Sequence, residues 1–476
     1  MALDESKVAA IVDAVLARLK AEGQGGKSPG APAIVRHDTG KHGIFETIDQ
    51  AVAAARTAFE HVSCMGLEVR EKGIENIRRA CVARTEELAR MAVSETGLGR
   101  VEDKIRKNVL AATKTPGPEI LVPRAFTGDH GLTLTERAPY GVICSITPCT
   151  NATETVINNV IGMVAGGNGV VINGHPTAKG VIAHTVRLLN EAMVAAGLPD
   201  NLVSTIVEPT IESAGTVMKH PGTALVVVTG GPAVVKAAMA TGKKCIAAGP
   251  GNPPAIVDET AILPRAAKDI IAGASLDNNI VCIVEKNIVA VDAIADKLKQ
   301  EMIRAGAYYL KDSQAARVAK AVIDGDHPNK KFVGKNVGFI LREAGTGIDV
   351  PDECRIAFME VEESHPMVQV EQLLPVLPFV RVRNVDDAIQ AGLRIEHGYR
   401  HTAVMHSLNI SNLHRYAAAA NTSIFVKNGP SFAGLAMTGE GYTSWTIASP
   451  TGEGLTTAIN YTRERRCVLK DYFRIV

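Results

Sequence analysis

Five short apolar runs separated by helical segments constrain the fold of this 476-residue chain more than any other feature. Strands that alternate with helices build a parallel sheet with helices on both faces. Such a doubly wound α/β domain binds its ligands at the C-terminal ends of its strands. The expected strands lie at 142–146, 169–172, 202–206, 225–228 and 244–247, and the expected helices near 154–165, 177–196, 211–219 and 231–241.

A second set of apolar runs predicts a second α/β domain. A chain of this length is too long for one simple core, so more than one domain is expected. Residues 45–115 have helical periodicity instead, including 48–59 and a long stretch at 68–96. We therefore predict two α/β domains with a ligand cleft between them. The strands of the second domain are expected near 254–257, 286–291, 376–382, 402–406 and 422–426.

The first 22 residues form a separate unit. Their apolar residues recur at the spacing of one helical stripe: Val8, Ile11, Val12, Val15, Leu16 and Leu19. Residues 23–42 then read as a flexible linker rich in glycine and proline. A short amphipathic helix on a tether either docks on its own domain or binds a partner, and the pattern leaves both open.

The tail of the chain, residues 461–476, lies outside the α/β pattern. It has strand character but no obvious core of its own. Together with residues 132–137, we expect it to form an arm that pairs with another subunit.

The charge balance and the cysteines exclude several classes of protein. The net charge of +1 argues against binding to nucleic acid or to an anionic membrane, which needs a basic surface. The eight cysteines form no CxxC pair, and no apolar run has secretory or membrane length. A reducing cytoplasm, with no disulfide framework and no metal site, is therefore expected.

Cys282 and Asn151 are the candidate catalytic residues. Cys282 ends a polar run that closes on two apolar residues, and Asn151 follows the strand expected at 142–146. A thiol can attack a carbonyl carbon, and an Asn amide can hold the resulting oxyanion. The structural alternatives are a buried inert thiol and a simple strand-end cap.

No GxGxxG follows a strand, so the nucleotide site must be sought elsewhere. Thr229, Gly230 and Gly231 join a strand to a helix that begins with Pro232. Such a helix N-terminus could bind a pyrophosphate through its free amides, although an ordinary tight turn has the same pattern. His175 and Pro176 also end a strand and could line an adenosine pocket, but a histidine there also suits a helix cap.

In this order the motifs resemble the aldehyde dehydrogenase superfamily over residues 43–476, and most closely its CoA-acylating branch. Within that branch the chain is most similar to the propionaldehyde and acetaldehyde dehydrogenases of bacterial microcompartments. The segment 447–467 also looks like that branch. The ordered set is Pro148-x-x-Asn151, His175-Pro176, Thr229-Gly230-Gly231, the Gly-Pro-Gly-Asn at 249–252, Cys282 and the Glu-Gln-Leu-Leu-Pro at 371–375.

The resemblance implies a fold and a set of roles. The fold would be α/β, with a Rossmann-type cofactor domain (43–123 and 141–248), an α/β catalytic domain (249–445) and a β oligomerisation arm (124–140 and 446–476). Cys282 would be the nucleophile and Asn151 the oxyanion-hole amide. The implied cofactor-binding residues are Thr147, Pro148, His175, Pro176, Thr229, Gly230, Gly231, Gly249 and Glu371.

One departure from the family pattern decides the implied reaction. Hydrolytic members carry a glutamate that activates water for deacylation, and the matching residue here is Ala248. Without that glutamate, water would not be activated to hydrolyse the acyl-enzyme thioester, and CoA would accept the acyl group instead. The resemblance thus implies that a short-chain aldehyde, most closely propionaldehyde, reacts with NAD⁺ and CoA to give acyl-CoA and NADH, and that CoA shares the NAD cleft. His175, where hydrolytic members commonly carry lysine, leaves the choice between NAD and NADP open.

The resemblance also implies a location and partners. Residues 1–22 would bind shell proteins and direct the enzyme to the lumen of a cytoplasmic bacterial microcompartment, and the arm favours a homodimer or homotetramer. Three alternatives remain open: an acetaldehyde-preferring acylating enzyme, a hydrolytic semialdehyde-type dehydrogenase, and a non-catalytic shell-associated scaffold.

Overall fold

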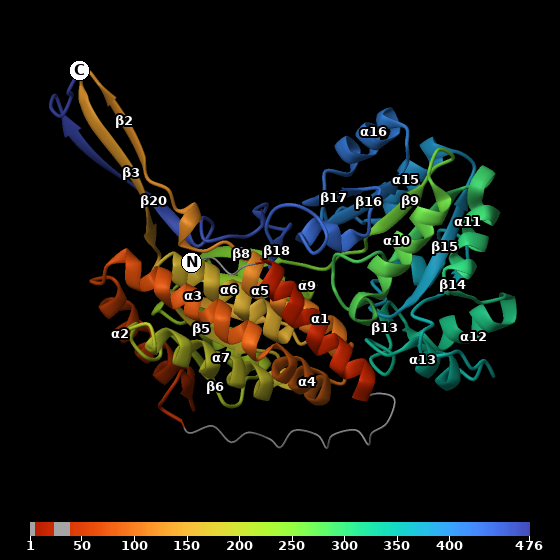
Figure 1. The fold of residues 1–476 in the computed structure, drawn as a ribbon, viewed down its shortest axis with the longest axis horizontal. Helices are drawn as coiled ribbons and strands as arrows, with labels where there is room; N and C mark the ends of the chain where they lie inside the picture. The colour runs from red at the N-terminus through yellow and green to blue at the C-terminus, as the bar shows by residue number, and fades with distance from the viewer. Residues whose placement is uncertain (1–4, 23–38) are drawn as a thin grey trace. The chain divides into compact units, whose positions relative to one another are not determined.

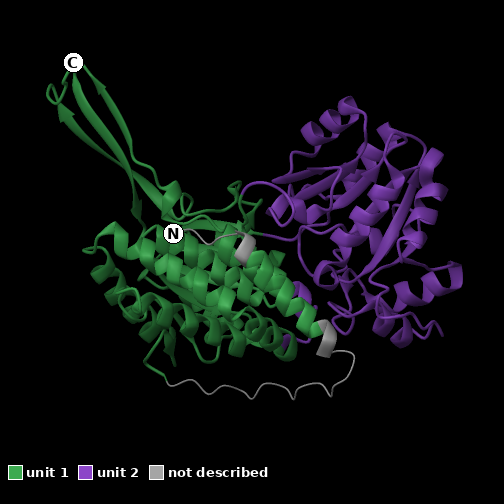
Figure 2. Ribbon diagram, viewed as in Figure 1, with its two compact units in different colours: residues 1–95, 105–248, 442–476 green, residues 96–104, 249–441 purple. Residues whose placement is uncertain are grey.

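The computed structural model describes residues 5–22 and 39–476 (Figure 1). The greater part of the predicted linker, residues 23–38, lies outside this range. The chain divides into two compact units (Figure 2). Unit 1 comprises residues 1–95, 105–248 and 442–476, and unit 2 comprises residues 96–104 and 249–441.

Unit 1 contains a six-stranded sheet in the order β1-β6-β5-β4-β7-β8, and every neighbouring pair is parallel. All five strands predicted for this region are confirmed, because their apolar runs are buried on both faces of the sheet. The strands are β1 (Ile44–Phe45), β4 (Val142–Thr147), β5 (Gly169–Gly174), β6 (Val203–Ile206), β7 (Thr223–Thr229) and β8 (Lys244–Ala248).

Helices cover both faces of this sheet, as the alternating pattern predicts (Figure 1). The predicted single stretch at 68–96 is wrong in one respect, because the helix breaks at Arg84. Thr85 begins the second helix, and its side-chain hydroxyl donates to the carbonyl of Ile105. The helices are α2 (Ile48–Val62), α3 (Leu67–Ala83), α4 (Thr85–Thr96), α5 (Val101–Lys114), α6 (Ala152–Ala165), α7 (Lys179–Val194), α8 (Ile211–Lys219) and α9 (Pro232–Met239).

The strand order of unit 1 reverses around β4. The chain passes from β4 to β5 and β6 on one side and then returns to β7 and β8 on the other. In doubly wound sheets the crevice outside the carboxyl ends of the strands at such a reversal is the usual ligand site. The residues that end β5, β4 and β7 therefore occupy the position at which this architecture binds ligands.

Unit 2 contains a seven-stranded parallel sheet in the order β11-β14-β15-β10-β9-β16-β17. The five strands predicted for this region are confirmed. The strands are β9 (Pro254–Val257), β10 (Asn287–Val291), β11 (Tyr308–Tyr309), β14 (Ala357–Glu360), β15 (Val376–Val382), β16 (Thr402–His406) and β17 (Ile424–Lys427). The helices include α10 (Leu263–Ser275), α11 (Asp292–Arg304), α12 (Asp312–Val322), α13 (Val337–Glu343), α14 (Pro366–Gln369), α15 (Val385–Ile395) and α16 (Ile410–Ala420).

A three-stranded antiparallel sheet projects from unit 1 (Figure 1). It consists of β2 (Arg124–Gly128), β3 (Gly131–Pro139) and β20 (Thr462–Lys470). Most of β2 and β20 is exposed, including the apolar side chains of Phe126 and Val468. The two predicted arm segments thus pair with each other, and their pairing with another subunit stays a prediction.

The N-terminal helix α1 (Glu5–Glu22) packs against unit 1 in this structure. Val8 and Leu16 are buried, whereas Ile11 keeps 44% of its surface exposed. Arg18 forms an ion pair with Glu86 of α4. The predicted helix is confirmed, and two of the six residues of its stripe, Val8 and Leu16, are buried. Within the described residues, no helix is long and apolar enough to cross a membrane.

Candidate active site

Asn151 lies just beyond β4, at the position that caps α6. Its side chain makes no capping bond, so the strand-end cap alternative does not explain it. Its Oδ1 instead accepts a hydrogen bond from Lys107 Nζ at 2.8 Å. Lys107 belongs to α5, is fully buried, and pairs with the equally buried Glu154 at 3.1 Å. The amide therefore belongs to a buried, charged network.

The turn between β7 and α9 has the shape of an anion cradle. A Cβ on Gly230 would lie 2.7 Å from a methyl carbon of Val234, so only glycine fits there. Gly231 caps α9 without a side-chain bond, and Pro232 occupies the first helical turn. Since the first amides of a helix lack intrahelical partners, this start suits a phosphate group. The pyrophosphate contact predicted for Thr229–Gly231 stays a prediction.

His175 is exposed after the end of β5 and acts as a cap. Its Nδ1 accepts a hydrogen bond from the Thr177 backbone at 3.2 Å, and Pro176 begins a short 3₁₀ helix. The capping role that the sequence left open is therefore present. An adenosine contact by His175 or Pro176 stays a prediction.

In unit 2, Cys282 follows a loop held in an unusual backbone conformation. Asp277, Asn278 and Asn279 all have positive φ, at 49°, 54° and 69°. Asp and Asn tolerate this left-handed region better than other residues with a Cβ, which explains the Asp-Asn-Asn run. Lys104 Nζ and the Arg100 backbone N–H both donate to the Asp277 carboxylate, at 2.9 and 2.7 Å. The loop before the thiol is therefore fixed.

The exposure of Cys282 separates it from the structural cysteines. It is partly exposed, whereas Cys81 and Cys144 are fully buried. Burial raises the pKa of the Cys81 thiol to about 12 and raises that of Cys144 as well. These two thiols are inert at neutral pH because only the thiolate is a nucleophile. The exposure of Cys282 favours the reactive interpretation over the inert one.

Lys286 ties the two sides of the Cys282 loop together. Its buried ammonium donates to the carbonyl of Asn279 at 2.5 Å, to Asn279 Oδ1 at 2.7 Å and to the carbonyl of Val281 at 3.2 Å. Burial lowers the pKa of Lys286, and the nearby Glu371, Cys282 and Glu285 oppose that shift. Because the attraction is mutual, a charged Lys286 favours the thiolate form of Cys282.

Three groups lie around Gly251 in unit 2: Glu371, Cys282 and His401. A Cβ at this position would lie 2.8 Å from the Cys282 carbonyl oxygen and 3.1 Å from the His401 ring. Its N–H donates to Glu371, whose pKa burial raises while Lys286 opposes the shift. Burial lowers the pKa of His401 to about 4, so its imidazole is neutral at pH 7. Glu371, Cys282 and His401 therefore all pack around one glycine.

Ala248 ends β8 and is 3% exposed. Its carbonyl accepts a hydrogen bond from the Gly230 N–H at 3.2 Å. Gly249, the next residue, is partly exposed. Ala248 therefore presents a methyl group at this strand end, and its match to the glutamate of hydrolytic members stays a prediction.

Asn252, the last residue of the Gly-Pro-Gly-Asn motif, has a structural role. Its amide nitrogen donates to the carbonyls of Val368 and Ile395, both at 2.9 Å, and its oxygen accepts from Asn287 at 3.0 Å. The motif therefore combines a glycine that makes room for the Cys282 carbonyl and the His401 ring with an asparagine that joins three segments of unit 2.

The structure adds four residues that the sequence analysis missed: Lys107, Glu154, Lys286 and His401. One signal was present, because Glu154 is the only charged residue in the otherwise uncharged helix α6. A lone carboxylate in such a helix demands a buried cation. Nothing comparable marks Lys286, since Glu-Lys pairs are usual on protein surfaces.

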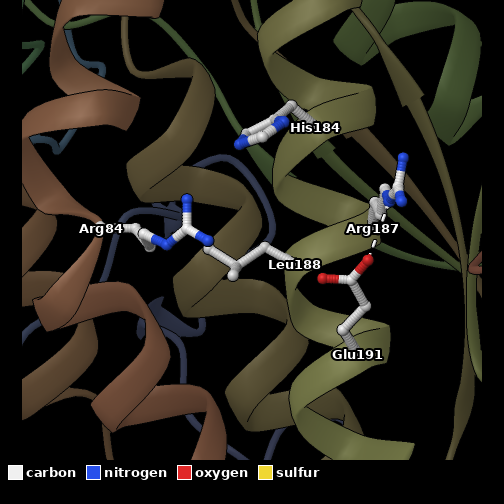
Figure 3. A pocket seen from close by; sticks show the side chains of 5 residues that line it. All are labelled: Arg84, His184, Arg187, Leu188 and Glu191. Atoms are coloured by element: carbon white, nitrogen blue, oxygen red, sulfur yellow. Dashed lines mark hydrogen bonds and ion pairs between the residues drawn. The ribbon is translucent and has the colours of Figure 1, made fainter. Parts of the chain in front are cut away.

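A pocket of about 200 Å³ lies elsewhere on unit 1 (Figure 3). Arg84, His184, Arg187, Leu188 and Glu191 line it. Arg84 and His184 both pair with Glu87, and Arg187 pairs with Glu191. Because carboxylates already neutralise these cations, the pocket offers no site for a further anion.

Comparison with known proteins identifies the fold. The model of the aldehyde dehydrogenase family matches residues 39–319, more than half of the chain. The chain belongs to the aldehyde dehydrogenase family. The predicted family and fold class are thereby confirmed.

The curated relatives place the chain in the CoA-acylating branch. It is 47% identical to the acetaldehyde dehydrogenase (acetylating) EutE of Salmonella typhimurium, over the full length of both chains. It is 44% identical to the propanal dehydrogenase (CoA-propanoylating) of the same organism, over 91% of this chain and 93% of that protein. The branch predicted from the motifs is confirmed, and the two relatives differ in their aldehyde.

Solved structures of this branch share the fold over nearly the whole chain. An engineered glycolyl-CoA reductase with bound NADP⁺ is 47% identical, with a TM-score of 0.90 over 91% of this chain and 99% of that one. The propionaldehyde dehydrogenase of Rhodopseudomonas palustris with bound propionyl-CoA is 47% identical, with a TM-score of 0.89 over 94% and 98%. A propionaldehyde dehydrogenase from the fucose-utilisation microcompartment of Clostridium phytofermentans is 46% identical, with a TM-score of 0.89 over 91% and 100%.

Proposed function

We propose that this chain oxidises a short-chain aldehyde, propionaldehyde first among them, with NAD⁺ and CoA to give acyl-CoA and NADH. One observation carries the choice of CoA over water as the acyl acceptor. Ala248 presents a buried methyl group at the end of β8, where hydrolysis would require a carboxylate base. The NADP⁺ and propionyl-CoA bound to solved relatives support the two cofactor classes predicted from the sequence.

Cys282 is the nucleophile in this proposal. Its sulfur, as thiolate, forms a bond to the aldehyde carbon, and the carbonyl oxygen becomes an oxyanion. In this proposal Lys286 favours the thiolate form of Cys282 through its positive charge. The Nδ2 group of Asn151 and the backbone N–H of Cys282 donate hydrogen bonds to the oxyanion.

The oxyanion then reforms the carbonyl and expels a hydride, which NAD⁺ accepts when bound. The product on Cys282 is a thioester. The fit of NAD⁺ rests on the glycine-only turn at Gly230 and the open helix start at Gly231. The wider proposed cofactor set consists of Thr147, Pro148, His175, Pro176, Thr229, Gly249 and Glu371.

CoA takes the acyl group in the second half of the reaction. The CoA thiolate attacks the thioester carbon, the bond to Cys282 breaks, and Cys282 leaves as thiolate. Thioester exchange conserves the bond type, so this step needs no base comparable with the one that water requires. CoA shares the NAD cleft in this proposal, because both ligands contain an ADP moiety.

The test is a turnover count. With NAD⁺ and propionaldehyde, NADH should stop at one equivalent per active site without CoA and continue when CoA is added. Sustained NADH formation without CoA would instead identify the hydrolytic, semialdehyde-type alternative. Comparing kcat/KM for C2 to C4 aldehydes then separates a propionaldehyde enzyme from an acetaldehyde enzyme, because one methylene changes pocket binding by about 1–3 kcal/mol.

Residues 1–22 are proposed to bind shell proteins of a bacterial microcompartment and to direct the enzyme to its lumen. The support is the amphipathic stripe of α1 and the microcompartment origin of a solved relative. Because Val8 and Leu16 are buried against unit 1 here, shell binding must exchange that contact for another. Deleting residues 1–22 should leave the specific activity unchanged and abolish co-assembly with shell proteins; persistent co-assembly would refute the role.

The arm of β2, β3 and β20 is proposed to join subunits in a homodimer or homotetramer. Its support is the exposed apolar surface of Phe126 and Val468 on a sheet that has no core of its own. Replacing both with Asp should lower the mass measured by light scattering. An unchanged mass would remove the arm from the interface.

A further inference from the structure

Lys107 stands at the centre of the buried network around Asn151. Its ammonium lies 2.8 Å from Asn151 Oδ1 and 3.1 Å from Glu154 Oε1, and 5.4 Å from the centre of the Trp445 ring. Lys107 and Glu154 have no exposed surface. A buried lysine is costly unless it is paired, so this position is specified by its partners and not by solvation.

The contact fixes which end of the Asn151 amide faces Lys107. An ammonium has three donors and no acceptor, so only the carbonyl oxygen of the amide can face it. The opposite orientation would place the amide N–H groups against the ammonium. The Nδ2 group must therefore point away from Lys107, and its contact with Thr150 Oγ1 is long, at 3.4 Å.

The positive charge of Lys107 also makes the Asn151 amide a stronger hydrogen-bond donor. A cation on the carbonyl oxygen draws electron density from the nitrogen, so the N–H groups become more positive. In a buried site such polarisation strengthens the next hydrogen bond in the chain. An oxyanion stabilised by Asn151 would therefore be held more strongly when Lys107 is in place.

Glu154 keeps the network neutral without competing for Asn151. It follows Asn151 by three residues on α6, so one carboxylate and one amide oxygen meet the same ammonium. Thr153 adds to this arrangement, since its hydroxyl contacts Glu154 at 3.1 Å and Asn108 at 2.7 Å. The network is thus built from two adjacent turns of α5 and α6.

We infer that Lys107 is a positioning residue that orients and polarises Asn151 for stabilisation of the oxyanion. The inference rests on the proposed function, because Asn151 acts on an oxyanion only if Cys282 attacks an aldehyde. Lys107 itself touches neither substrate nor cofactor in this assignment. Its effect must therefore pass through Asn151, and that dependence can be measured.

The experiment is a double-mutant cycle on the full-length enzyme, followed by single-turnover NADH formation and by steady-state kinetics. Lys107→Met alone would leave Glu154 buried without a cation, so the change is made in a Glu154→Gln background, which also serves as the matched control. Adding Lys107→Met to Glu154→Gln should lower kcat by about 10-fold and change KM for the aldehyde by less than about 2-fold. When Asn151→Ala is also present, adding Lys107→Met to Glu154→Gln should lower kcat by less than about 2-fold.

Two other outcomes would overturn the inference. An equal loss with and without Asn151 would show a general structural role and overturn the inference. Wild-type activity in Asn151→Ala alone would show that Asn151 is not the oxyanion donor, and it would overturn the inference. The proposed function would still be tested separately, by asking whether NADH formation beyond one equivalent requires CoA.

A second variant, Lys107→Arg, tests the inference if the protein that carries both Glu154→Gln and Lys107→Met does not fold. Lys107→Arg retains the cation for Glu154 but displaces the donor from Asn151 Oδ1. It should lower kcat by several-fold in the presence of Asn151 and have no further effect in its absence. No loss in the first case would overturn the inference.

Discussion

The two proposed catalytic residues are each supported by a buried lysine, but the two supports are built differently. Lys286 lies four positions after Cys282, and its hydrogen bonds go to the loop that carries the thiol. Lys107 lies 44 positions before Asn151, on another helix. The lysine that supports the nucleophile is therefore a neighbour in sequence, whereas the lysine that supports the oxyanion donor comes from another helix.

The charge balance of the two lysines differs as well. Lys107 pairs directly with Glu154, whereas the hydrogen bonds of Lys286 end on neutral oxygens. The charge of Lys286 acts on Cys282 and also on the carboxylates Glu371 and Glu285. Lys107 combines a direct ion pair with a hydrogen bond that orients and polarises Asn151.

The largest effect should come from Cys282→Ala. Loss of the nucleophile removes both halves of the reaction, so kcat should fall by about four to six orders of magnitude. NADH formation with propionaldehyde, NAD⁺ and CoA measures it, with the melting temperature as a control for folding. Residual activity near the wild-type level would remove Cys282 from the mechanism.

Asn151→Ala should have the next largest effect. Losing one oxyanion donor costs about 10²–10³ in kcat. The KM for the aldehyde should change little, because the donor acts mainly on the transition state. A rise in KM with unchanged kcat would instead assign Asn151 to ground-state binding.

Glu285→Gln probes a long-range contact that holds the Cys282 loop. Burial raises the pKa of Glu285 to about 7, and the Ser431 N–H and hydroxyl both donate to its carboxyl group. Between pH 4.5 and 7 the folded state holds a proton that the unfolded chain has released, so stability falls as pH rises through this window. The glutamine variant lacks this titration.

The variant should gain stability relative to wild type as pH rises from about 5 to 8, by up to about 3 kcal/mol. Scanning calorimetry at both pH values measures the difference. Glu343→Gln is the control, because Glu343 is exposed, pairs with Lys331 and has a lowered pKa. A difference that is the same at pH 5 and pH 8 for Glu285→Gln would contradict the expectation.

Lys286→Met should have the smallest effect on the reaction. Removing the cation beside Cys282 should move the midpoint of its alkylation by iodoacetamide to higher pH, because the thiolate loses a nearby positive charge. Mass spectrometry of the Cys282 peptide follows the rate at each pH. Lys331→Met, which removes a surface cation of the same unit, should leave the midpoint unchanged.

An identical midpoint in Lys286→Met and wild type would show that the lysine only shapes the loop. The two lysines would then differ in position alone and not in kind.

Much of the fold could be predicted because its signals are short-range. Each of the apolar runs, such as 142–146 and 254–257, specifies a buried strand without knowledge of its neighbours. The break at Arg84 could not be found this way, because no glycine or proline marks it. Thr85 turns the chain through a bond to Ile105, a residue of another helix.

The residues of the candidate site also fall into two groups, those found from local sequence and those that only the folded structure shows. Cys282, Asn151 and the turn at Gly230 were found from motifs, since their residue types are demanded by chemistry or by backbone space. Lys107 and His401 were not, because lysine and histidine usually lie on surfaces, and only the packed structure buries them.

Two parallel α/β sheets, and a thiol after a loop of aspartate and asparagine, can be predicted from the amino-acid sequence alone. These follow from local preference, from hydrophobic periodicity and from the chemistry of single side chains. Only the tertiary structure decided which end of Asn151 faces Lys107, and which charges stand near Cys282. The physical reason is that a buried charge is specified by its partners, and those partners come from segments that meet only after the chain has folded.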